Sequence, residues 1–170
     1  MSDAADRGLL LNEVCDLLYR EAACLDEQRY DDWLDLFTQD CEYWLPAWKG
    51  DHQPTEDPKR ELSLIYYNAR SGLEDRVWRV QSGQSVASQP VPRTGHFVAN
   101  VQIEKMTEGV IPVSASWQTH SYMHKNKSTV TFFGRYHYGL VRAGEALRIK
   151  RKKIVLMNDY IPTMLDFYNI

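Results

Sequence analysis

The spacing of the apolar residues changes partway along this chain, and that change limits the folds open to it. Between Leu11 and Leu25 apolar residues recur every three or four positions, which is the period of one buried helix face. From Phe97 onward they alternate with polar residues, which is the period of strands that bury one face. Helices followed by antiparallel strands are typical of an α+β fold.

Local composition predicts the individual elements. We expect a first helix from Leu11, a second over residues 30–37, and a third that begins at Ser71. Residues 41–45 are rich in aromatics and predict a strand, whereas residues 62–67 suit a short strand or the start of a helix. Later strands are expected over residues 97–103, 111–117, 129–141 and 146–156, with turns at 108–109, 124–127 and 143–145.

Length and charge indicate an ordinary globular protein. The 170 residues predict one domain over residues 1–170, in which residues 1–8 form a flexible N-terminal tail. Residues 48–60 and 82–93 are expected to be loops, and the first of these serves either as a contact loop or as a plain surface excursion. Twenty basic and twenty-three acidic residues give a net charge of −3, which argues against a nucleic-acid surface.

The sequence shows no sign of a membrane or export signal. No apolar run is long enough to span a bilayer, and the polar N-terminus does not resemble a secretory signal. Cys15, Cys24 and Cys41 are odd in number and occupy apolar positions, which favours packed, reduced thiols. We therefore expect a cytoplasmic protein.

Metal and nucleotide sites have little support in the sequence. A Rieske cluster needs two Cys and two His in paired short spacings, and no Cys here has a His close by. His120 and His124 are four residues apart at a strand end and its turn, where an exposed or hydrogen-bonded pair is favoured over an iron site. The glycine motifs of nucleotide-binding loops and the Gly-x-Ser-x-Gly motif of serine hydrolases are absent.

An acid/base pocket is the catalytic alternative that the sequence leaves open. Polar side chains enclosed between a curved sheet and helices would have shifted pKa values suited to proton transfer. The candidates are Tyr19, Asp40, Tyr43, His96, Trp117 and His137. The other interpretation is that five Trp, ten Tyr and five Phe simply fill this space, and we favour it. We thus predict no catalytic, cofactor-binding or metal-binding residue on this chain.

A run of four basic residues lies inside the last predicted strand. Alternation places Lys150 and Lys152 on one face, and Arg151 and Lys153 on the other. Since one face must pack on the core, one pair has to meet carboxylates, either inside the chain or on a partner. The acidic balance of the chain weakens a nucleic-acid patch, so we predict a subunit interface at these four residues and Tyr160.

Ordered segments over nearly the whole chain, from about Leu11 to Ile170, match one family. They are Tyr19-Arg20-Glu21-Ala22, Leu25-Asp26, Trp33-Leu34, Tyr43-Trp44-Leu45-Pro46-Ala47-Trp48, Thr55-Glu56-Asp57-Pro58, Leu62-Ser63-Leu64-Ile65-Tyr66-Tyr67, Gly72-Leu73-Glu74-Asp75-Arg76-Val77, Arg93-Thr94-Gly95-His96, Asn100-Val101, Lys152-Lys153-Ile154-Val155-Leu156 and Asn158-Asp159-Tyr160-Ile161. In these segments the chain resembles the small (beta) subunit of aromatic-ring-hydroxylating dioxygenases, in particular the benzoate, anthranilate and salicylate group. Asn68-Ala69-Arg70 replaces the Pro-Asn-Arg usual in benzoate-like members, which leaves the exact substrate open.

The resemblance implies a cone-shaped, nuclear-transport-factor-2-like (cystatin-like) fold, with N-terminal helices packed on a curved, mainly antiparallel sheet. It implies a non-catalytic, structural subunit that assembles with a large (alpha) subunit, typically three of each, and with other copies of itself. The large subunit would carry a Rieske 2Fe-2S cluster and a mononuclear non-heme iron. A reductase, sometimes with a ferredoxin, would supply electrons from NADH, so that the oxygenase can hydroxylate an aromatic carboxylate in aromatic catabolism.

Two other functions compete with this one. A stand-alone isomerase or dehydratase of the same cone fold would use an Asp/His/Tyr pocket, and its activity would be present in the isolated chain. A binding module for a partner unrelated to oxygenation would not associate with a Rieske-type large subunit.

Overall fold

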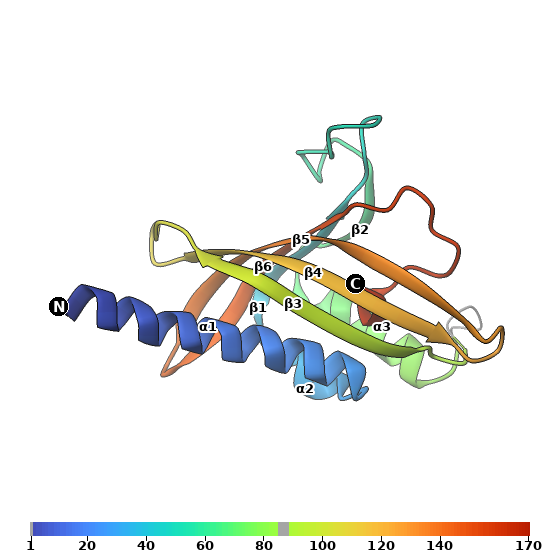
Figure 1. Ribbon diagram of the computed structural model, residues 1–170, viewed down its shortest axis with the longest axis horizontal. Coiled ribbons are helices and arrows are strands. Elements are labelled where there is room, and N and C mark those ends of the chain that lie inside the picture. Colours follow the sequence, from blue (N-terminus) through green and yellow to red (C-terminus); the bar gives the residue numbers. More distant parts are fainter. Residues whose placement is uncertain (1, 85–88) are drawn as a thin grey trace.

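The computed structural model describes residues 2–84 and 89–170, and it begins with a long helix that is followed mainly by strands (Figure 1). The elements are α1 (Ser2–Asp26), α2 (Tyr30–Leu34), β1 (Phe37–Pro46), β2 (Ser63–Tyr67), α3 (Arg70–Gln81), β3 (Arg93–Ile103), β4 (Ile111–Met123), β5 (Ser128–Ala143), β6 (Ala146–Leu156) and the 3₁₀ helix η2 (Phe167–Asn169). The predicted helices and the alternating strands are thus all present, and the α+β prediction is confirmed.

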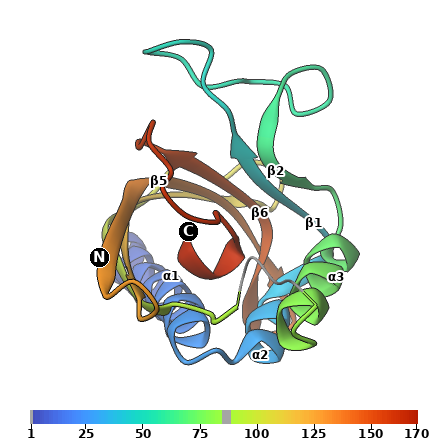
Figure 2. The same ribbon diagram turned by 90° about the vertical axis from the view of Figure 1, so that its right-hand side faces the viewer.

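The six strands form one sheet in the order β2-β1-β6-β5-β4-β3. All neighbours are antiparallel except β1 and β6, which are parallel. The sheet curls around a core, with α1 packed against β3 and α3 packed against β1. Figure 2 shows the helices and the C-terminal turn on the inner side of the curled sheet. Every second residue of each strand therefore points into a cone, and the residues between point outward.

The backbones of the paired strands β5 and β6 come very close at Gly134. Gly134 pairs with Leu156, and a Cβ atom at Gly134 would collide with the carbonyl oxygen of Val155. Only glycine allows the two strands to approach in this way. Its inward neighbours on β5, Phe132 and Tyr136, are buried in the core.

Helix α1 starts earlier than the sequence predicts. The apolar stripe indicated a start at Leu11, but the helix begins at Ser2, so the tail expected over residues 1–8 is helical from Ser2 onward. Residues 5–9 of this helix are exposed, and its first turns extend beyond the sheet (Figure 1). Because these turns bury no apolar face, the hydrophobic pattern did not reveal where the helix starts.

The second helix is shorter than predicted, and the first strand is longer. Helix α2 ends at Leu34, and Phe37 already belongs to β1, where it pairs with Ile149 of β6. Phe37 lies four residues after Trp33, so it fits the helical period as well as the strand period. Pairing with β6, far along the chain, decides between them.

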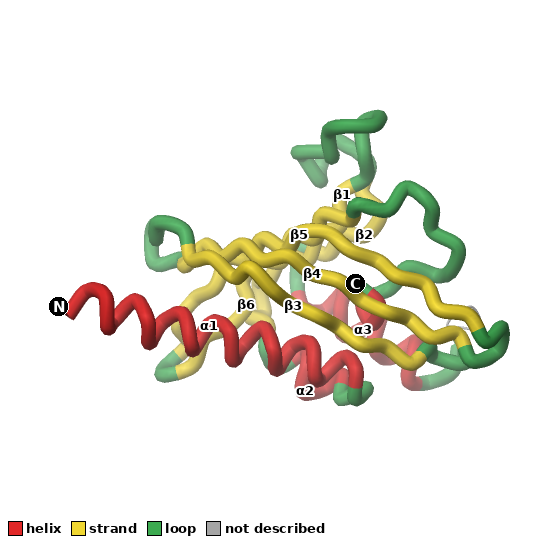
Figure 3. The backbone as a smooth tube through the Cα atoms, in the orientation of Figure 1, coloured by secondary structure: helices red, strands yellow, loops and turns green. Residues whose placement is uncertain are grey.

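The loop between β1 and β2 extends away from the rest of the molecule (Figure 3). Its base is closed by a bridge between Trp48 and Pro54 and by an ion pair between Lys49 and Glu61. The other predicted loop, residues 82–93, includes residues 85–88, which lie outside the described part. No helix in the described part of the chain combines the length and the apolar character that crossing a membrane requires.

Candidate functional site

Three of the six residues predicted for an acid/base pocket lie on the surface. Tyr19 is half exposed on α1, and His137 is exposed on the outer face of β5. Asp40 is exposed on β1, and its carboxylate lies 3.3 Å from the ammonium group of Lys150. Hydrogen bonds from Thr38 and Lys150 lower the pKa of Asp40. The idea that all six side chains share one pocket is therefore wrong.

The other three residues point into the cone, where they meet different neighbours. Tyr43 packs edge-on against Trp33, with ring centroids 6.1 Å apart. Trp117 stacks on Tyr136 at 5.0 Å with nearly parallel rings. His96 is bound to Asp26 at the far end of α1. The prediction that aromatic rings fill the cone is correct for Tyr43 and Trp117.

The centre of the cone holds a buried ion pair. Glu21 of α1 is 2% exposed, and its Oε1 accepts a hydrogen bond of 2.7 Å from the ammonium group of Lys152 on β6. The hydroxyl of Tyr138 donates to the other carboxylate oxygen at 2.8 Å, and the indole N–H of Trp33 donates to Oε1 at 3.3 Å. The ammonium group also lies 4.1 Å from the centroid of the Tyr136 ring. The carboxylate thus has three donors, as a buried charge requires.

Burial controls the titration of this cluster. It lowers the pKa of Lys152, while the negative charge of Glu21 opposes that shift. Burial also raises the pKa values of Tyr43, Tyr136 and Tyr138 well above the ordinary range, and the Glu21 carboxylate adds to that effect. Lys152 is paired with a carboxylate and surrounded by neutral phenols, and it holds α1 against β6. Its buried position does not resemble an open acid/base site.

A second polar pair joins the end of α1 to β3. The Nδ1 of His96 lies 2.5 Å from Oδ1 of Asp26, and the backbone N–H of His96 donates to Oδ2 at 2.9 Å. Thr94 donates its hydroxyl to Oδ1 at 2.9 Å. Partial burial raises the pKa of Asp26, but these hydrogen bonds outweigh it and hold the pKa below the usual value. The pair orients the ring of His96 so that its Nε2 points into the interior.

That Nε2 is one of several buried polar atoms without a hydrogen-bond partner. Thr119 and Ser121, which point inward from the neighbouring strand β4, have unpartnered hydroxyls, and so does Tyr30 on α2. The interior therefore contains polar atoms whose hydrogen bonds are incomplete, in contrast to the network around Glu21.

The C-terminal segment occupies the space beside these groups. Phe167 of η2 stacks on Trp33 at 5.0 Å and meets Tyr30 edge-on at 5.1 Å. Asp166 is 3% exposed, and its carboxylate receives the guanidinium of Arg76 from α3 at 2.5 Å and the backbone N–H of Phe167 at 2.9 Å. Figure 2 shows this turn inside the ring formed by sheet and helices. Side chains from both ends of the chain therefore fill the cone.

The basic run on β6 does not follow simple alternation. Gly139 of β5 pairs with Arg151 and Leu140 pairs with Ile149, so Lys150 is skipped in a β-bulge. Lys150 stays exposed, whereas Lys152 turns inward. The predicted interface must therefore lose Lys152, because this side chain is 1% exposed and its carboxylate partner is in the same chain.

The remaining residues of the predicted interface are accessible. Arg151 pairs with Glu42 at 2.8 Å on the outer face, and the ammonium group of Lys153 lies 4.5 Å from the ring of Trp44. Tyr160 is 78% exposed on the loop that follows β6. The sequence left open whether the carboxylates that meet the basic strand lie inside this chain or on a partner. For Lys152 the carboxylate is Glu21 of the same chain.

Thiols and histidines do not assemble into a metal site in the described residues. No group of three or more His, Cys, Asp or Glu side chains there could hold a metal ion, so the residues do not fit a Rieske cluster or a mononuclear iron. All three cysteines are free thiols, and burial raises the pKa of Cys41 to about 11. His120 contacts Thr131 and Gln118 at 2.9 and 2.8 Å, which matches the hydrogen-bonded interpretation of this residue.

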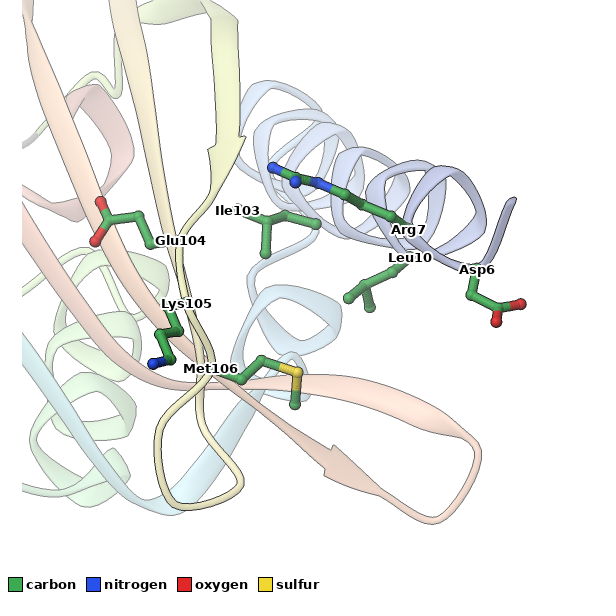
Figure 4. A pocket seen from close by; sticks show the side chains of 7 residues that line it. All are labelled: Asp6, Arg7, Leu10, Ile103, Glu104, Lys105 and Met106. Atoms are coloured by element: carbon green, nitrogen blue, oxygen red, sulfur yellow. The ribbon is translucent and has the colours of Figure 1, made fainter. Parts of the chain in front are cut away.

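A groove of about 460 Å³ separates the start of α1 from the turn that follows β3. Figure 4 shows that Leu10, Ile103 and Met106 line it, while the carboxylates of Asp6 and Glu104 point away from each other. Because its charged groups diverge, the groove holds no pair suited to acid/base chemistry.

The predicted site residues did not include Glu21 and Asp166, the two buried carboxylates among the residues whose burial is described. For Glu21 a signal existed, because it lies three residues after Leu18 and four before Leu25, on the buried face of the helix. For Asp166 there was none, since the segment that carries it shows no periodicity.

The curled sheet with helices on its inner side places the chain in a class of cone-shaped α+β folds. The chain superposes on a putative scytalone dehydratase from Novosphingobium aromaticivorans with a TM-score of 0.71, covering 98% of this chain and 97% of that one, at 15% identity. At this identity the likeness concerns the fold alone, and the cone-shaped, nuclear-transport-factor-2-like fold is confirmed.

The family follows from closer relatives. Residues 20–163 match the family described as ring hydroxylating beta subunit. The chain is 41% identical to the toluate 1,2-dioxygenase subunit beta of Pseudomonas putida, over 92% of this chain and 96% of that one. The beta subunit of benzoate 1,2-dioxygenase from Burkholderia mallei superposes with a TM-score of 0.78 at 37% identity, covering 94% and 96%. This chain belongs to the family of ring-hydroxylating dioxygenase beta subunits, and its enzyme class is that of a dioxygenase subunit.

Proposed function

We propose that this chain is the structural, non-catalytic small subunit of a cytoplasmic oxygenase that hydroxylates an aromatic carboxylate of the benzoate, toluate or anthranilate type. The observation that supports this most is the occupied interior: Glu21 and Lys152 neutralise each other, and Phe167 fills the space next to Trp33. A subunit built in this way contributes shape and rigidity. The substrate class comes from the names of the relatives with about 40% identity.

The proposal assigns the chemistry to the partner. A large subunit carries the Rieske 2Fe-2S cluster and the mononuclear iron, a reductase delivers electrons from NADH, and three large and three small subunits form the hexamer. The family membership supports this division, and the described residues of this chain lack a ligand set for either group.

Co-expression with a tagged benzoate-type large subunit tests the proposal. We expect the two chains to co-purify in equal amounts at the mass of a hexamer, with iron in the complex. With the reductase and NADH supplied, we expect ring hydroxylation only when both chains are present. If the chain purifies as a stable monomer that does not bind the large subunit, the proposal is refuted.

The second candidate is an isomerase or dehydratase that acts without a partner. The Asp26–His96 pair, with a buried and unpartnered Nε2, is the observation that favours it. It predicts turnover by the isolated chain that is lost in Asp26→Asn and His96→Gln. Asp40, an earlier candidate for this role, is on the surface. Absence of turnover on hydroxy and keto substrates by the isolated wild-type chain would remove this candidate.

A further inference from the structure

The outer face of the curled sheet exposes a row of large apolar side chains. Phe97 of β3 pairs with Gln118 of β4, which pairs with Phe133 of β5, and the backbone N–H of Met157 donates to the carbonyl of Phe133. Phe97, Phe133 and Met157, the residue that follows β6, therefore lie in one row, with the exposed Gln118 of β4 between the two rings. The three apolar side chains are 59%, 49% and 40% exposed. A groove of about 650 Å³ runs along this row.

Exposure of such a row is costly in a chain that stays alone. The side chains between the inward-facing residues of an antiparallel sheet are normally polar when that face meets water. Contiguous exposed apolar side chains rimmed by polar residues instead mark contact surfaces. Figure 2 shows the three helices on the inner side, so no helix of the described chain covers this row.

Cationic side chains without carboxylate partners adjoin the row. Arg135 lines the same groove and donates only to the hydroxyl of Ser116, at 3.2 Å. His137, two residues further along β5, pairs across the strands with Lys153. Neither Arg135 nor Lys153 has a carboxylate within 4.0 Å among the described residues. Burial lowers the pKa of His137, and the positive charges of Lys153 and Arg135 lower it further, while the Glu104 carboxylate opposes them.

The two features together indicate the chemistry of the occupant. An apolar centre beside unpaired cations is complementary to an apolar surface that carries Asp or Glu side chains at its edge. A two-fold contact with a second copy would place the cations of one chain against those of the other, which is unfavourable, whereas a three-fold contact would place this face against a different surface of the copy. The capture experiment distinguishes that three-fold contact from docking on the large subunit.

We propose that this outer face, defined by Phe97, Phe133, Arg135, Lys153 and Met157, docks onto an acidic-rimmed apolar surface of the large subunit. The proposal rests on the assignment of this chain as a small subunit and states which face it uses. It replaces the buried Lys152 of the predicted interface with Arg135 and the apolar row, and it retains Lys153.

A competition experiment measures the contribution of this face. Wild-type chain and the variant Arg135→Glu/Lys153→Glu are co-expressed with a tagged large subunit, and the ratio of captured small chains is determined by mass spectrometry. We expect the variant to be captured at least about 30-fold less than wild type, because reversing charges inside an interface weakens binding strongly. Phe133→Asp should be reduced to a similar extent.

The matched control is Lys105→Glu/Lys125→Glu, which makes the same charge change at exposed turn positions away from this face. It should be captured as well as wild type. Circular dichroism confirms that each variant is folded, and Arg135→Gln/Lys153→Gln replaces the reversal if that variant unfolds.

The outcomes separate this inference from the proposed function. Equal capture of wild type and the charge-reversed variant overturns the docking face and leaves the small-subunit assignment intact. The wild-type chain could also self-associate, and the variant could lose that oligomer while it is still captured by the large subunit. This result also overturns the docking face, in favour of a contact between copies. Failure of wild type itself to bind the large subunit refutes the proposed function.

Discussion

Lys152 inside the cone has a carboxylate partner, whereas Arg135 beside the apolar row on the outer face has none among the described residues. Inside, Lys152 meets Glu21 at 2.7 Å, and both remaining hydrogen bonds of that carboxylate come from Tyr138 and Trp33. Outside, Arg135 faces only a serine hydroxyl beside exposed apolar rings. The chain thus neutralises the buried charge of Lys152 with its own carboxylate, whereas on the outer face we propose that a partner supplies the acidic groups.

The largest effect is expected where the interior pairing is broken. Glu21→Ala leaves the Lys152 ammonium group buried without a counter-charge, which should cost about 3–5 kcal/mol of unfolding free energy. Urea unfolding at neutral pH measures this. A matched control is Glu13→Ala, which removes an exposed ion pair with Arg142 and should cost less than about 1 kcal/mol.

A double variant tests whether the unpaired charge of Lys152 causes this loss of stability. Glu21→Leu/Lys152→Met removes both charges, and it should recover most of the loss because a buried ion pair can often be replaced by apolar residues. If the double variant is as unstable as Glu21→Ala, packing rather than the unpaired charge explains the loss.

The next largest effect concerns the segment that fills the cone. Asp166→Ala removes the carboxylate that binds Arg76 and caps η2, and we expect a loss of about 2–3 kcal/mol. Hydrogen exchange should speed up over residues 165–170. Asp159→Ala, an exposed position on the preceding loop, is the control that should leave both stability and exchange unchanged.

A substitution at the close contact between the β5 and β6 backbones should lower the free energy of unfolding by an intermediate amount. Gly134→Ala introduces a Cβ that meets the carbonyl of Val155, and it should cost about 1–3 kcal/mol. Gly8→Ala makes the same change on an exposed helix turn with open space, so it should be neutral or stabilise by up to about 1 kcal/mol. Thermal unfolding of both variants tests this, and equal effects would contradict the close approach.

The Asp26–His96 pair predicts a smaller, pH-dependent effect. Because the folded pKa of Asp26 lies below its ordinary 3.8, its contribution is fully present above 3.8 and is lost as the pH falls through the folded pKa. Asp26→Asn should cost about 1 kcal/mol at pH 7. The difference from wild type should shrink in unfolding titrations below pH 3.8, and a difference that grows there would contradict the lowered pKa.

The smallest effect on stability is expected on the outer face. Phe133→Ser should change the unfolding free energy by only about 0.5 kcal/mol, because this ring is half exposed. A loss of several kcal/mol in the isolated chain would mean that Phe133 belongs to the core, and the contrast between the two faces would fail.

The sequence alone determined the order and period of the elements. The stripe of α1 and the alternation of β3 to β6 are local properties, because a helix and a half-buried strand each repeat over a few residues. The family resemblance, carried by ordered short segments, is also a property of the sequence. Aromatic filling of the cone could be inferred from composition, and Tyr43 and Trp117 agree with it.

Only the tertiary structure decided where the charges of the basic strand go. The sequence indicated that one part of the run must meet carboxylates, but it could not say which one. A bulge at Lys150 turns Lys152 inward, and its partner Glu21 lies 131 residues earlier in the chain. Burial of a charge depends on what surrounds it in three dimensions, and no local pattern encodes a register shift between β5 and β6. The same shift leaves Lys153 beside Arg135 on the face that we assign to the partner.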